Sequence, residues 1–136
     1  MQEKPWIIIL THGRAGEELM RSAKMIMGEL KNVKAFSLMP GMSPEDFIAK
    51  VKEKLETLPE GVLVLTDLFG GTPFNGALAL SRTFDLHIVS GLNIAMLIEA
   101  DMLRNHLAGR ELAESVRKIG VEACRVAGSS TMKNME

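Results

Sequence analysis

Alternating apolar strands and amphipathic helices predict an α/β fold: a doubly wound, mostly parallel sheet with helices on both faces. Two runs, Ile7–Leu10 and Val62–Leu65, are apolar without polar alternation, which is typical of parallel strands covered on both sides. Segments with helical spacing of apolar residues follow each run. With 136 residues, 46% of them apolar, the chain can bury the core of one domain. We expect that domain over residues 1–127, followed by a polar tail over residues 128–136.

The first half of the chain predicts two strands and two helices. After the strand at Ile7–Leu10, residues 17–28 place their apolar side chains on one face at spacings of three and four. Residues 33–38 alternate between apolar and polar and predict a second strand. Ser43 is a good N-cap with a proline directly after it, which predicts a helix from Pro44 to about Leu58.

The third strand leads into a glycine-rich loop. The run Val62–Asp67 repeats the apolar character of the first strand and ends in a carboxylate. Thr72 as N-cap and Pro73 at the first helical position predict a helix from Phe74 to about Thr83.

The last third of the chain predicts one further parallel strand, two helices and an added strand. Residues 85–90 form the fourth strand, Asn93 caps a helix through about Leu103, and residues 110–119 form another helix. Residues 121–126 alternate as an edge strand does, which predicts an antiparallel strand beside about four parallel ones. The polar residues 128–136 are expected to be poorly ordered.

Charge and cysteine content exclude several classes of protein. Sixteen basic and seventeen acidic residues give a net charge of −1, which argues against nucleic acid or an anionic membrane as the partner. The single cysteine, Cys124, excludes an internal disulfide. The N-terminus lacks the pattern of a secretory signal, and no apolar run approaches the roughly 20 residues that span a bilayer. We therefore expect a cytoplasmic protein.

Two polar side chains follow the two most apolar strands. His12 comes directly after Ile7–Thr11, and Asp67 directly after Val62–Thr66. Carboxyl ends of parallel strands form the ligand-binding edge of such sheets, so the two side chains meet if these strands are neighbours. A carboxylate on one imidazole nitrogen fixes the tautomer and leaves the other nitrogen a lone pair, which describes a nucleophile. Taken alone, His12 could equally be a loop histidine that bonds a nearby carbonyl.

The Gly70–Pro73 loop fits an anion. Glycines let backbone amides approach a phosphate, and the start of a helix offers unpaired N–H groups with a favourable dipole. Without His12, the same loop would be read as a tight turn plus a helix cap. Together, His12, Asp67 and the loop favour a phosphorylated histidine, with the Thr72 hydroxyl as a further donor.

Other functional sites find less support. His87 and His106 lack a second ligand at a metal-binding spacing, so we interpret them as structural or solvated side chains. The motifs of a serine hydrolase and of a P-loop kinase are absent from the sequence. Gly13 and Gly16 lack the third glycine of a dinucleotide fingerprint. Asp67 as a phosphoacceptor would need an acidic cluster after the first strand to hold magnesium, and His12 stands there instead.

Four motifs resemble the IIA domain of the mannose family of the bacterial sugar phosphotransferase system (PTS). They are Thr11–Gly13, Met39–Gly41, Asp67–Asn75 and Gly91–Leu97, and the resemblance runs from about Trp6 to Val126. It implies a phosphotransferase component that needs no cofactor or metal. A histidine matching His12 would accept a phosphoryl group from the phosphocarrier HPr and pass it to a histidine of a IIB subunit. That subunit would phosphorylate a sugar as it crosses a IIC/IID permease, which would bring the protein to the membrane periphery.

The resemblance also implies roles for particular residues. Asp67 would orient the imidazole, and the family's dimers exchange a C-terminal strand that matches residues 121–126. We expect phosphate-binding groups at Gly13, Phe69, Gly70, Gly71 and Thr72. A partner-facing rim is expected at Arg14, Met39, Pro40 and Met96, together with Phe69. Two alternatives stay open: a regulatory phosphoacceptor of the same family, and a non-catalytic dimeric binding module for a phosphorylated metabolite. The sequence does not indicate which sugar is transported, because a IIA domain contacts only proteins.

Overall fold

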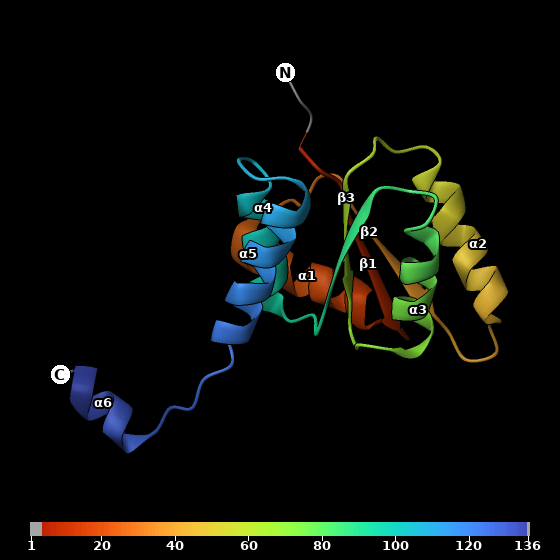
Figure 1. Cartoon of the computed structure of the whole chain (residues 1–136). Coiled ribbons are helices and arrows are strands. Elements are labelled where there is room, and N and C mark those ends of the chain that lie inside the picture. Colours follow the sequence, from red (N-terminus) through yellow and green to blue (C-terminus); the bar gives the residue numbers. More distant parts are fainter. Residues whose placement is uncertain (1–3, 136) are drawn as a thin grey trace.

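A computed structural model describes residues 4–135 and has the predicted α/β architecture (Figure 1). Four parallel strands form one sheet in the order β2-β1-β3-β4. The strands are β1 (Ile7–His12), β2 (Val33–Leu38), β3 (Val62–Thr66) and β4 (Leu86–Ser90). The helices are α1 (Ala15–Met27), α2 (Pro44–Leu55), α3 (Gly71–Leu80), α4 (Ile94–Leu103), α5 (Gly109–Glu122) and α6 (Ser129–Met135).

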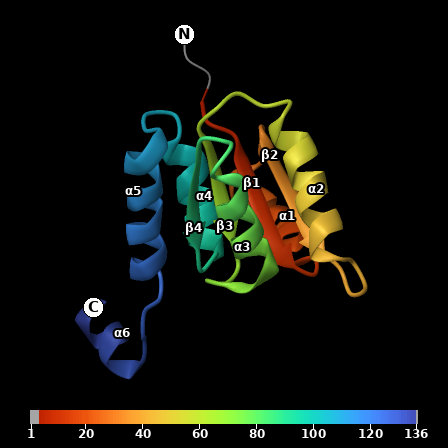
Figure 2. The same ribbon diagram turned by 45° about the vertical axis from the view of Figure 1, so that its right-hand side comes forward.

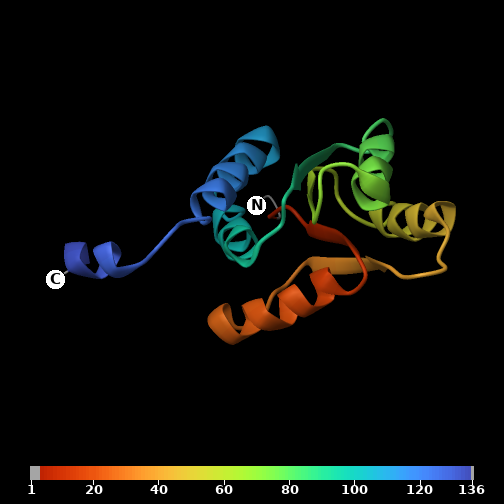
Figure 3. The same cartoon turned by 90° about the horizontal axis from the view of Figure 1, so that it is seen from below.

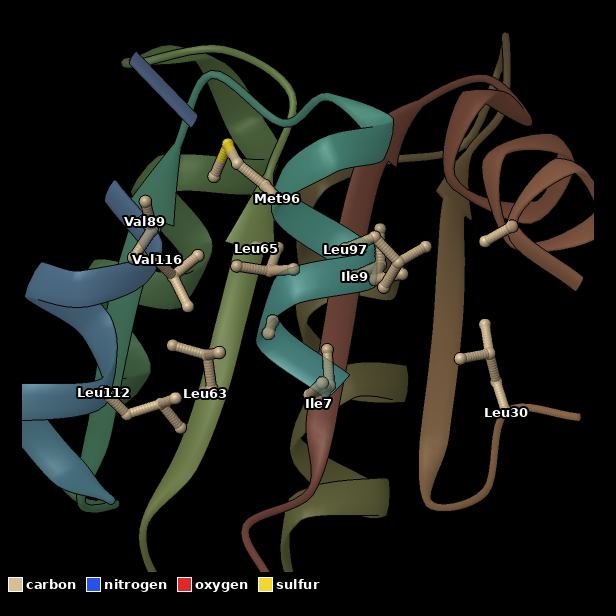
Figure 4. Packing of buried hydrophobic residues seen from close by; sticks show 12 residues of the cluster. Ile7, Ile9, Leu30, Leu63, Leu65, Val89, Met96, Leu97, Leu112 and Val116 are labelled. Atoms are coloured by element: carbon tan, nitrogen blue, oxygen red, sulfur yellow. The ribbon is translucent and has the colours of Figure 1, made fainter. Parts of the chain in front are cut away.

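Helices cover both faces of the sheet, as Figures 2 and 3 show. Ile7 and Ile9 of β1 pack into one core with α1, α4 and α5 (Figure 4). The alternate residues Ile8 and Leu10 pack into a second core with α2 and α3. Burial on both sides explains why β1 and β3 lack polar alternation.

The direction of chain crossing reverses between β1 and β3. From β1 the chain crosses to β2 on one side, and it then returns to place β3 on the other side of β1. The two strands that precede His12 and Asp67 are therefore neighbours. Their carboxyl ends flank the switch point at which open α/β sheets bind ligands.

Two of the predicted helix caps are confirmed and one is wrong. Ser43 accepts a hydrogen bond from the Asp46 amide, and Asn93 accepts one from the Met96 amide. Thr72 is not the N-cap of α3, because Gly70 caps that helix and Gly71 begins it. Gly70 and Gly71 have φ values of 86° and 77°, which glycine adopts more readily than other residues. They allow the helix to begin at Gly71, before Thr72.

The C-terminal segment differs from its prediction. Val121 and Glu122 complete α5, and residues 124–127 have no regular secondary structure, so the single chain holds no strand at 121–126. A strand needs a sheet edge to pair with, and α5 directs the chain away from the sheet (Figures 1 and 2). The tail, predicted to be poorly ordered, forms the short helix α6, none of whose residues is buried. Glu136 and residues 1–3 lie outside the described residues.

Candidate active site

His12 and Asp67 meet at the switch point. Asp67 Oδ2 lies 3.0 Å from His12 Nδ1 and accepts a hydrogen bond of 2.9 Å from the His12 main-chain amide. An ionised carboxylate can only accept, so this geometry places the imidazole proton on Nδ1 and leaves a lone pair on Nε2. The His12 side chain is 47% exposed, which leaves the ring accessible to a partner.

The free edge of the His12 ring faces the start of α3. His12 follows the alternation of Ile8 and Leu10, which point to the face that α2 and α3 cover. A Cβ atom added at Gly71 would lie 3.1 Å from His12 Cε1 and 3.4 Å from Nε2. The first residue of α3 is therefore next to the nitrogen that carries the lone pair.

The N-terminus of α3 carries no side-chain cap within the described chain. The amides of Gly71 and Thr72 belong to the first turn, where N–H groups lack partners within the helix. Pro73, in the same turn, has no amide hydrogen to leave unpaired. The structure thus places Gly71 beside His12 Nε2, with Gly70 and Thr72 next to it in the chain, and the start of a helix suits an anion.

Two exposed apolar side chains stand between Asp67 and α3. Leu68 is 57% exposed and Phe69 is 77% exposed. The Phe69 ring packs against Phe74 of α3 with 4.5 Å between ring centroids. The aromatic pair holds the loop against the helix while Phe69 stays open to a partner.

The expected rim is only partly at the surface. Arg14 is exposed before α1, and together with Met39 it lines a groove of about 360 Å³ on the β2 side. Pro40 is exposed beside Met39. Met96 does not belong to the rim, because it is 2% exposed and packs in the core. The Asn93 cap places Met96 in the first turn of α4, facing inward, which helical spacing alone did not indicate.

The other histidines lie apart from this site. The His87 side chain is 30% exposed in β4, with Nε2 3.7 Å from Asp85 Oδ1. His106 is exposed after α4. Among residues 4–135, no group of three or more His, Cys, Asp or Glu side chains is arranged to hold a metal ion. No described helix is long and apolar enough to cross a membrane.

The sequence did not predict the hydrogen bonds that Thr11 makes with Gly13 and Gly16. The Thr11 hydroxyl accepts a hydrogen bond from the Gly16 amide and donates one to the Gly13 carbonyl, each 3.0 Å long. A threonine inside an apolar strand, five residues before a glycine near a helix start, was the available signal. The register of the turn that brings them together is decided by tertiary contacts.

A family model described as the PTS system fructose IIA component matches residues 6–117. The chain belongs to this family. It is a PTS IIA component of the mannose family, and His12, Gly13 and the Asp67–Asn75 loop all lie within the matched residues.

Individual relatives agree with this assignment. This IIA chain is 39% identical over 102 residues to the mannose-specific EIIAB component of Escherichia coli K12; the match covers 73% of the chain but 32% of that relative, so the chain spans about a third of its length. It is 31% identical over 130 residues to the fructose-specific EIIA component of Bacillus subtilis, covering 93% and 89% of the two chains. The solved mannose/sorbose IIA subunit from Enterococcus faecalis is 36% identical, with a TM-score of 0.86 and 93% and 96% coverage.

Proposed function

We propose that this IIA component is a phosphocarrier: His12 accepts a phosphoryl group from phospho-HPr and passes it to a histidine of a IIB subunit. The observation that carries the proposal is the orientation of the His12 ring. Nδ1 is held at 3.0 Å from Asp67 Oδ2, and Nε2 faces the glycine-rich start of α3. A IIC/IID permease would then move the sugar that IIB phosphorylates, and this complex would bring the IIA component to the cytoplasmic side of the membrane.

The transfer needs little chemistry beyond position and charge. The Nε2 lone pair attacks phosphorus, the bond between phosphorus and the donor breaks, and the leaving donor keeps that electron pair. Because Nδ1 retains its proton, the phosphorylated ring gains positive charge, which the Asp67 carboxylate stabilises. Transfer to IIB runs the same step in reverse with a new acceptor, so no metal or cofactor takes part.

The start of α3 supplies the charge stabilisation. Main-chain amides of Gly71 and Thr72, together with the Thr72 hydroxyl, would donate to the phosphoryl oxygens, and the helix dipole favours negative charge there. Gly13 and the Phe69–Gly70 backbone complete the phosphate-binding set. Arg14, Met39, Pro40 and Phe69 form the surface on which HPr and IIB dock.

The open edge of β4 supports a homodimer. Beside β4 lies a cavity of about 600 Å³ whose apolar wall includes Phe74, Leu86, Ile88 and Met96. The segment after α5 includes Val126, which is 99% exposed. We propose that this segment pairs with β4 of a second copy. Analytical ultracentrifugation should show a dimer for the full chain and a monomer for a chain ending at Glu122; a full-length monomer would contradict the dimer.

Phosphorylation tests the main proposal directly. The purified protein is incubated with Enzyme I, HPr and radiolabelled phosphoenolpyruvate, and wild type is compared with His12→Ala. We expect acid-labile, base-stable label on wild type alone, as a phosphohistidine gives. A His106→Ala variant is the matched control, since that histidine is exposed and far along the chain from the site.

The possible outcomes separate the alternatives. Label on wild type and His106→Ala but not on His12→Ala supports the carrier, and chase of the label onto a purified IIB subunit distinguishes transport from a purely regulatory phosphoacceptor. Absence of label from wild type would overturn the proposal. In that case, saturable binding of a sugar phosphate would favour the non-catalytic module.

A further inference from the structure

We propose that Thr11 is a positioning residue for phosphoryl transfer: its buried hydroxyl closes the turn that carries His12 and thereby fixes the direction of the imidazole. The inference rests on the proposed function of His12. It concerns how the backbone that carries the ring is held, and so adds a second constraint to the one that the Asp67 carboxylate provides.

Thr11 acts through the main chain and not on the phosphoryl group. Its side chain is fully buried, and by strand alternation it shares a face with Ile9, under α1. His12 points to the other face, toward the start of α3. The two neighbours are therefore separated by the sheet, and Thr11 reaches the site only through the backbone that both belong to.

Both hydrogen-bonding functions of the Thr11 hydroxyl are used. It donates to the Gly13 carbonyl and accepts from the Gly16 amide, and these two partners bracket the turn between β1 and α1. The Gly13 amide in turn donates to the Leu38 carbonyl of β2 over 2.8 Å. The amide and the carbonyl of Gly13, the residue directly after His12, are thus both hydrogen-bonded. These bonds restrict the turn and with it the backbone of His12.

Close packing of α1 against β1 makes the second bond possible. A Cβ atom at Gly16 would come within 2.7 Å of Ile9 Cγ2 and 3.2 Å of Thr11 Cγ2. Only glycine allows the first turn of α1 to lie so near the strand. The closeness of α1 to β1 places the Gly16 amide within hydrogen-bonding distance of the Thr11 hydroxyl, so this bond depends on both residues.

Removal of the hydroxyl should move the turn. Thr11→Val keeps the shape of the side chain but leaves the Gly16 amide and the Gly13 carbonyl without their partner, a cost that a shift of the turn would relieve. In-line transfer depends on the alignment of Nε2 with phosphorus, so a small displacement slows the chemical step. Donor affinity should be unaffected, because Thr11 is buried and cannot contact HPr.

The test compares Thr11→Val with Thr11→Ser and Thr66→Val in single-turnover transfer from phospho-HPr. Thr66 is the matched control: it is also fully buried at the end of a central strand, and its hydroxyl has no hydrogen-bond partner within residues 4–135. We expect Thr11→Val to lower the rate at saturating donor about ten-fold or more, with the half-saturating donor concentration unchanged. Thr11→Ser, which keeps the hydroxyl, should restore the rate, and Thr66→Val should match wild type.

Failure of this inference and failure of the proposed function give different results. If wild type is phosphorylated and Thr11→Val is as fast as Thr66→Val, Thr11 has no positioning role and the carrier function stands. If wild type takes no phosphoryl group, the proposed function fails. The positioning role is then tested by the ¹⁵N chemical shifts of the His12 ring, recorded without donor. Identical shifts in Thr11→Val and wild type would overturn it. Should Thr11→Val not fold, amide exchange of Gly16 in wild type decides, because exchange at the rate of an unprotected amide contradicts the bond.

Discussion

The carboxyl ends of β1 and β3 lie side by side, and each has a buried threonine directly before a residue of the candidate site. Thr11 precedes His12, and Thr66 precedes Asp67. The Thr11 hydroxyl is bonded to Gly13 and Gly16, whereas within the described chain the Thr66 hydroxyl has no partner. Two segments with nearly the same local pattern are thus held by different means.

The difference follows from what each loop has to do. The Thr11 hydroxyl bonds to the main chain of the turn after β1, so the backbone at His12 is fixed. The loop after β3 is held from outside, by the His12 contacts of Asp67 and by the packing of Phe69 on Phe74. The turn after β1 carries the proposed nucleophile, and the loop after β3 carries the groups that we propose to meet phosphate and partner.

Asp67→Asn should give the largest effect, because it removes the negative charge that faces the His12 ring. With its oxygen in the place of Oδ2, asparagine still accepts from the His12 amide and from Nδ1, but it is neutral and no longer stabilises the positive charge of the phosphorylated ring. With its amide nitrogen there, it meets the His12 N–H as donor against donor and moves the ring proton to Nε2. We expect single-turnover transfer to fall about 100-fold or more in either orientation. Asp85→Asn is the control, because Asp85 faces His87 at 3.7 Å. An unimpaired Asp67→Asn variant would show that the negative charge of Asp67 has no part in transfer.

Gly71→Ala should come next, since it disturbs the α3 side of the site. The added Cβ would press on His12 at 3.1 Å from Cε1, and the φ of 77° adds about 1–2 kcal/mol of backbone strain. Gly28→Ala has a similar φ of 82° and open space for the Cβ, so it carries the strain alone. Both variants should lose stability in thermal unfolding, Gly71→Ala at least as much as Gly28→Ala, while only Gly71→Ala slows transfer, by about ten-fold. Equal transfer rates would mean that α3 does not approach the reacting nitrogen.

Phe69→Ala should have a smaller effect on the loop after β3. It removes the pair with Phe74 and the exposed apolar side chain that we propose to contact HPr. The second-order rate of uptake from phospho-HPr should fall by less than about ten-fold, because an aromatic contact contributes about 0.5–1.5 kcal/mol. Met25→Ala removes an exposed side chain at the other end of α1 and should leave the rate unchanged. The same rate in both variants would exclude Phe69 from the docking surface.

Thr66→Val should have the smallest effect and sharpens the comparison of the two threonines. Replacing a buried hydroxyl that has no partner in the described chain removes a desolvated polar group, so the free energy of unfolding should stay within about 0.5 kcal/mol or rise. Thr11→Val should lose about 1–3 kcal/mol in the same urea titration. Equal losses would show that the threonines are held alike.

Much of the fold could be predicted from local pattern. Apolar runs without alternation identified β1 and β3, cap residues located the starts of α2 and α4, and the end of each central strand pointed to His12 and Asp67. These features depend on residues that are close together in the chain, so short segments of sequence are enough to predict them. The N-cap of α3 is Gly70 and not the predicted Thr72, because the positive φ of Gly70 and Gly71 lets the helix begin before the better cap residue.

The alternation of strands and helices, the two polar strand ends and the glycine loop between Asp67 and α3 can all be read from local sequence. The pairing of β1 with β3, the burial of Met96, the hydrogen bonds of Thr11 and the course of the chain after α5 cannot. Propensity and periodicity act over a few residues, whereas these features arise where segments distant in sequence compete for the same space and the same hydrogen-bond partners.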